Sequence, residues 1–151
     1  MIPPSARVAA DAVVTMLRAA VAPHLVGDGK VPAPANPDAD VPAMPYSVVD
    51  AIPGGPGEGN WAFPEADVVF VFQVSSVGAS RAQAQGMADK VVKALFERNA
   101  AGYVHALAIA GVDVVFRAVQ STGGVTQEGT GAAQGLWTVP DRFELYLASN
   151  A

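Results

Sequence analysis

The chain has 151 residues, of which 51% are hydrophobic and 15% charged, so it is long and apolar enough to fold as one domain over residues 1–151. Its net charge of −5, with nine Lys and Arg and no basic run, argues against a surface for nucleic acid or an anionic membrane. The absence of cysteine excludes disulfides, thiolate metal sites and thiol nucleophiles.

The first predicted element is an amphipathic helix over residues 5–22, with Ser5 as its N-cap. Asp11 and Arg18 interrupt its apolar stretch and no basic start precedes it, which is atypical of a signal peptide. No segment of the sequence has the eighteen or so apolar residues that a membrane span requires. We therefore expect a soluble protein of the cytoplasm.

A proline-rich loop or arm follows at residues 27–45, with five prolines in nineteen residues. It has few large apolar side chains, so burial cannot offset the entropy that ordering it would cost. Two interpretations stay open here: a flexible linker, or an arm that becomes ordered against a partner.

Four strands are predicted from period-two patterns and turn residues, at residues 45–52, 66–76, 111–120 and 136–149. Pro140 indicates a bulge or an edge position within the last of them. Residues 121–135 are predicted to be a Gly-rich mobile loop. Residues 99–111 either extend the preceding helix or form a separate turn.

The second helix has explicit start signals. Ser80 lies three residues before Gln83, the spacing of a capping box. A core stripe at helical spacing follows, made of Ala84, Met87, Ala88, Val91, Ala94 and Leu95. The resulting order, α-β-β-α-β-β, predicts an α+β fold with a four-stranded, mainly antiparallel sheet and two helices packed on one face.

The sequence offers no convincing chemical site. The strand-to-helix turn "SSVGASR" has Gly78 but neither phosphate-binding glycine motif, so we interpret it as a junction that positions the helix. His24 and His105 stand alone, without a ligand or carboxylate at useful spacing. Asp38 and Asp40 lie in the proline-rich arm, where a rigid catalytic pair would not be built. We expect no enzyme activity, no metal and no cofactor.

Two groups of residues are candidates for contact with a subunit or another protein partner. The first is a pair of loop aromatics, which either anchor a partner or fold back over their own hairpin. The second group lies on one face of the sheet that mixes apolar and charged residues. Such a face either forms a subunit contact or is partly exposed to solvent. The candidates are Trp61, Phe63, Gln73, Arg117, Arg142, Glu144 and Tyr146.

Over roughly residues 7–148 the chain resembles a tail terminator protein of long-tailed, siphophage-type bacteriophages. The resemblance is carried by the strand "DVVFVFQVSS", by the helix "SRAQA" continuing into "ADKVVKAL", and by a last strand "RFELYL" after Pro-Asp. It implies that six copies form a ring on the last ring of tail-tube protein, stop tube polymerisation and present a surface to head-completion (connector) proteins. It implies no catalytic residue.

The same resemblance implies assembly in the host cytoplasm and then a place in the virion, at the head-proximal end of the tail. The alternatives are another neck or tail-completion protein of such a particle, or a small-ligand binding domain or cryptic enzyme. A ring contact that closes by rotation needs two different surfaces on one subunit. The mixed sheet face and the aromatic or proline-rich loops are the candidates for those surfaces.

Overall fold

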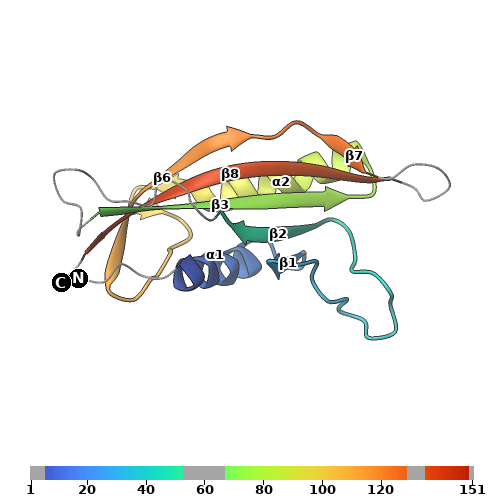
Figure 1. Cartoon of the computed structure of the whole chain (residues 1–151), viewed down its shortest axis with the longest axis horizontal. Coiled ribbons are helices and arrows are strands. Elements are labelled where there is room, and N and C mark those ends of the chain that lie inside the picture. Colours follow the sequence, from blue (N-terminus) through green and yellow to red (C-terminus); the bar gives the residue numbers. More distant parts are fainter. Residues whose placement is uncertain (1–5, 53–66, 129–134, 150–151) are drawn as a thin grey trace.

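The computed structural model describes residues 6–52, 67–128 and 135–149, which form a long twisted sheet with two helices (Figure 1). In chain order the elements are α1 (Ala6–Ala20), β1 (Leu25–Asp28), β2 (Tyr46–Ala51), β3 (Asp67–Gly78), α2 (Arg81–Phe96), β4 (Arg98–Asn99), β5 (Gly102–Tyr103), β6 (Val112–Thr122), β7 (Thr126–Glu128) and β8 (Leu136–Ser149). Within these described ranges, no helix is long and apolar enough to cross a membrane.

The four-stranded sheet in the order α-β-β-α-β-β, predicted from the sequence, is wrong. The main sheet has six strands in the order β1-β2-β3-β8-β6, with β7 also paired to β8, and β4 and β5 form a separate two-stranded sheet. The main sheet is mixed, because β1 pairs parallel to β2 while the remaining pairs are antiparallel. The strands missed are short: β1 contains Gly27 and meets β2 only across the arm, and β7 lies in the Gly-rich segment. β4 and β5 have two residues each and form a tight hairpin directly after α2, so residues 99–111 do not extend that helix.

The long central pair confirms the strand patterns that the sequence does show. β3 and β8 pair without a break from Asp67↔Ala148 to Gly78↔Trp137. Pro140 lies inside this pair, opposite Ser75. On the other side of β8, the interruption between β6 and β7 falls at residues 123–125, beside Pro140, whose missing N–H makes a break in pairing tolerable there.

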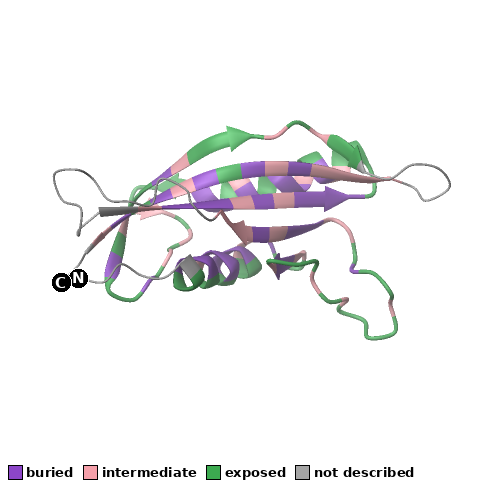
Figure 2. Ribbon diagram, in the orientation of Figure 1, coloured by how far each residue is buried: buried purple, intermediate pink, exposed green. Residues whose placement is uncertain are grey.

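Both helices contribute to one apolar core on the same side of the sheet. α1 buries Val13 and Leu17, and α2 buries the six residues of the predicted stripe. They meet inward-facing residues of β3 and β8, where the rings of Phe72 and Phe143 lie 5.5 Å apart. Figure 2 shows this pattern as alternating buried and exposed bands along the strands and helices.

The proline-rich segment, which occupies residues 29–45 between β1 and β2, projects away from α1 and β1 as a mostly exposed arm (Figures 1 and 2). It is tied down near its ends, where the backbone N–H of Gly29 donates to Val49 O (2.8 Å) and the Gln83 side chain donates to Met44 O (3.2 Å). Its tip is a local turn, in which the N–H of Ala39 donates to Asn36 O at 3.0 Å.

Candidate functional site

Both helices of the described chain lie on one side of the main sheet, and four of the predicted contact residues lie together on the other side. The register puts Gln73 opposite Arg142, and Glu144 and Tyr146 alternate onto the same face of β8. Arg142 Nε donates to Gln73 Oε1 at 3.2 Å, and the Tyr146 hydroxyl donates to Glu144 Oε2 at 2.8 Å. The hydrogen bond to Glu144 raises the pKa of Tyr146, because it stabilises the protonated phenol. We call this surface the open face.

Arg117 was predicted on the open face, but the structure places it on the helix-covered side. Arg117 pairs with Leu145, whose side chain is in the core. The register of β6 shifts between Val114 and Phe116, so Val115 is an extra residue and the in–out alternation reverses after it. The sequence contains no signal for this bulge, so a strict period of two assigns the wrong face.

The guanidinium of Arg117 joins the end of α2 to the segment that follows it. Nη1 donates to Leu95 O at 2.8 Å and Nη2 donates to His105 O at 2.7 Å. The group lies 4.0 Å from the centre of the Tyr103 ring, and Nε is buried without a hydrogen-bond partner among the described residues. Burial lowers the pKa of Arg117, and the neighbouring Tyr103 acts in the opposite direction. The side chain therefore caps one carbonyl at the C-terminus of α2 and binds a second in the segment before β6.

An exposed apolar strip runs along the free edge of the sheet, and the sequence did not single out its central residue, Phe116. The strip consists of Val115 (63% exposed), Phe116 (56%) and Tyr146 (38%). Val119 (45%) is exposed on the same strand, but it pairs with Phe143 and so lies toward the helix-covered face. The rings of Phe116 and Tyr146 meet edge to face at 5.7 Å. β6 is the last strand of the sheet within the described ranges, so no described strand pairs with the backbone along its outer edge. We call Val115, Phe116 and Tyr146 the β6 strip.

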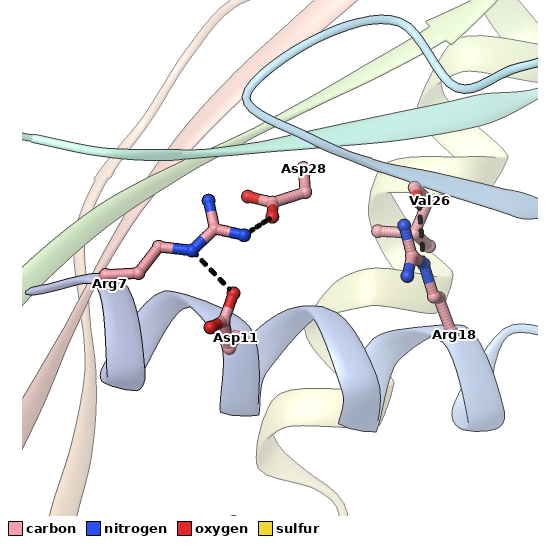
Figure 3. A network of polar contacts seen from close by, with 5 residues as sticks. All are labelled: Arg7, Asp11, Arg18, Val26 and Asp28. Atoms are coloured by element: carbon pink, nitrogen blue, oxygen red, sulfur yellow. Dashed lines mark hydrogen bonds and ion pairs between the residues drawn. The ribbon is translucent and has the colours of Figure 1, made fainter.

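The opposite edge of the sheet is better protected. In β1, the carbonyl oxygen of Val26 accepts a hydrogen bond from Arg18 Nε of α1 at 3.0 Å (Figure 3). Nearby, Arg7 bridges Asp11 (3.0 Å) and Asp28 (2.7 Å), joining α1 to β1. A cation bonded to an edge carbonyl discourages another strand from pairing there. The two edges therefore differ: β1 is guarded by side chains, whereas β6 is open and apolar.

The strand-to-helix turn at residues 75–81 is occupied by the chain's own groups. The Ser80 hydroxyl accepts from the N–H of Gln83 at 3.1 Å, which confirms this half of the predicted capping box. In the return bond, Gln83 Oε1 accepts from the N–H of Ala79 at 2.7 Å, one residue before the N-cap N–H that donates in the usual motif. A side chain at Gly78 would meet the backbone nitrogen of Ala84 at 2.5 Å, so this glycine permits the close helix–strand approach.

The remaining titratable groups do not converge. Within the described part of the chain, no group of three or more His, Asp or Glu residues could hold a metal ion. His24 Nε2 lies 2.9 Å from Lys90 Nζ; burial and the lysine charge, in that order, lower the pKa of His24. Trp61 and Phe63, the predicted aromatic anchors, lie outside the described residues.

Comparison with solved structures gives an informative likeness, whereas the sequence comparisons do not. No protein-family model matches the chain, and no curated protein sequence matches it. Among solved structures, a chain in the virion of a native gene transfer agent (GTA) particle superposes with a TM-score of 0.56 at 16% sequence identity. The match covers 93% of this chain and 94% of that chain. The two chains therefore share a fold over nearly their whole lengths.

Proposed function

We propose that this protein is a structural component of a phage-like particle, the tail terminator, which closes the end of the tail tube as a ring of six copies. The observation that carries the proposal is the fold shared end to end with a chain of a gene transfer agent virion. The proposed role needs no catalytic residue and no cofactor. The partners are other copies of this chain, the tail-tube protein and a head-completion protein, and the particle assembles in the host cytoplasm.

The surfaces of the molecule support an assembly role. An open edge strand with exposed valines and aromatic rings is unfavourable on a monomer, because it invites pairing and aggregation unless a partner covers it. Aromatic side chains such as Phe116 and Tyr146 are also enriched at the centres of protein interfaces. The open face beside the β6 strip supplies polar groups that suit the rim of such a contact.

A tube-length assay tests the proposal. Tail-tube protein of the same particle is polymerised with and without this protein, and tube lengths are measured in negative-stain images. We expect shorter tubes of narrower length distribution when the protein is present. Tubes of unchanged length, or binding to the head connector but not to tubes, would overturn the terminator assignment and favour another neck protein.

Val115→Asp is the matched variant for this assay, and Val104→Asp is its control. Val115 is 63% exposed in the β6 strip, whereas Val104 is 42% exposed in the segment after β5. Both changes place a carboxylate at an exposed position, so neither disturbs the core. We expect only Val115→Asp to abolish capping, because it puts a charge within the β6 strip, beside its central residue Phe116.

A further inference from the structure

Two adjoining hollows lie on the helix side of the molecule. The first, of about 850 Å³, is lined by α1, β1 and the base of the arm. The second, of about 350 Å³, lies between the end of α1 and α2. Both are lined by Ala22, Pro23 and His24, so they open on either side of the same turn. We refer to them together as the double hollow.

The double hollow collects positive charge in an acidic protein. Its walls include Arg7, Arg18, Lys30, Lys90 and Lys93, five of the chain's nine lysine and arginine residues. Among the described residues the walls contain two carboxylates, Asp28 and Glu97. Arg7 is paired with Asp28 at 2.7 Å and with Asp11 at 3.0 Å, so the positive charge of the hollow comes from the other four cations. Arg18 uses only Nε within the described part of the chain, which leaves its terminal nitrogens available. The surface therefore fits an acidic group of a partner.

The tip of the arm has the complementary character. Asp38 and Asp40 are both exposed on it. The turn is held by the Asn36 side chain, whose Oδ1 accepts from the backbone N–H of Asp38 at 3.1 Å. No hydrogen bond or ion pair links either carboxylate to the rest of the described chain. Ordered carboxylates held away from the body on a proline-rich support are suited to contact another molecule.

We propose that the acidic tip of the arm, carried by Asp38 and Asp40, docks in the double hollow of a second copy of this chain. The inference rests on the proposed ring and identifies one contact between its neighbouring subunits. The arm tip and the double hollow are different surfaces. Each copy therefore inserts its arm tip into one neighbour and accepts the arm tip of the other neighbour, as a head-to-tail ring requires. The base of the arm, Lys30 to Ala33, itself lines the hollow, and the arm leads away from it in Figure 1. The tip is thus directed toward a neighbour rather than toward its own hollow.

Charge reversal tests the contact from both sides. Asp38→Lys/Asp40→Lys reverses the tip and Lys90→Glu/Lys93→Glu reverses the hollow; all four side chains are exposed. We expect each double variant to weaken self-association on tube ends at least tenfold, and the quadruple variant, which swaps the charges, to recover to within threefold of wild type. Arg81→Asp/Arg98→Asp changes net charge as much as the lysine variant does, away from the hollow, and is expected to have little effect.

Cysteine cross-linking then identifies which molecules meet. The native chain has no cysteine, so Asp38→Cys and Lys93→Cys variants each carry a single thiol. Oxidation of the two variants mixed on tube ends should give covalent dimers in much higher yield than either variant alone. Dimers that form no more readily in the mixture would overturn the proposal. A chain that carries both cysteines and forms its disulfide only within one molecule would also overturn the proposal.

The outcomes separate this inference from the proposed function. If wild-type protein caps tubes and both charge reversals leave capping and association unchanged, the arm contact is wrong and the terminator assignment stands. If only the arm variant loses binding, the tip contacts a different protein, and the pairing of two copies is overturned. If wild-type protein neither associates nor caps tubes, the proposed function fails first.

Discussion

Replacing Arg117 with methionine should destabilise the protein, although the change removes an unusually buried charge. Arg117 is 5% exposed and makes two hydrogen bonds to backbone carbonyl groups, one at the end of α2 and one on the segment before β6. Methionine fills similar volume with a flexible apolar chain. The substitution therefore tests the hydrogen bonds with little change in packing.

Two effects oppose each other in the expected magnitude. Each hydrogen bond from a charged donor contributes about 1.5–3 kcal/mol, and both acceptor carbonyls lose their partner in the variant. Removing a buried guanidinium whose Nε has no partner recovers about 1–3 kcal/mol. The hydrogen bonds prevail, and the free energy of unfolding should fall by about 2–4 kcal/mol. For a chain of this length the melting temperature then falls by roughly 4–16 °C.

Urea unfolding followed by circular dichroism measures the effect, with Arg98→Met as the matched control. Arg98 lies over the same Tyr103 ring, at 4.7 Å, but its side chain is exposed. Its loss should cost at most about 1 kcal/mol, as expected for an exposed cation–π contact. If Arg117→Met is as stable as wild type, or if the two variants lose stability equally, the carbonyl hydrogen bonds are not what holds this region together.

Three further predictions concern backbone space and pH. Gly78→Ala should destabilise the protein by about 1–3 kcal/mol, because the added Cβ would lie 2.5 Å from the backbone nitrogen of Ala84. Gly86→Ala, in helix α2 with open space around it, should stabilise the protein by about 0.5–1 kcal/mol. Equal melting temperatures of the two variants would contradict this. His24 has a lowered pKa, so the folded state binds fewer protons than the unfolded state, and the free energy of unfolding should fall as pH drops below 6.5. His24→Gln should reduce this dependence on pH, measured by urea titrations at several pH values. An unchanged dependence would contradict the assignment. Burial raises the pKa of Asp141, so the free energy of unfolding should fall as pH rises above 3.8 through the pKa of the folded state. Asp141→Asn should therefore be at least as stable as wild type at pH 7. A less stable variant would refute this.

The elements that the sequence predicted correctly are those specified by neighbouring residues. Helix α2 begins at the Ser80 cap and buries all six residues of its apolar stripe, because cap and periodicity are both local properties. β8 occupies residues 136–149, as its alternation indicates, even though Pro140 lies within it. Four open-face residues also lie together as expected, since β3 and β8 pair without a bulge.

The features that sequence analysis missed depend on distant partners. β1 is specified by parallel pairing with β2 across the arm, and no turn motif marks such a pairing. The face of Arg117 depends on one extra residue at Val115, which alternation alone cannot reveal. The double hollow combines residues of α1, β1, α2 and the arm base, so its positive character emerges only in three dimensions.

Counting the copies of this protein bound per tail tube tests the central claim most directly. Fluorescently labelled protein is added to growing tubes, unbound protein is removed, and bound copies are counted by stepwise bleaching on single tubes of measured length. The terminator account predicts six copies located at one end, independent of tube length. A number that increases with tube length, or label distributed along the tube wall, would contradict it.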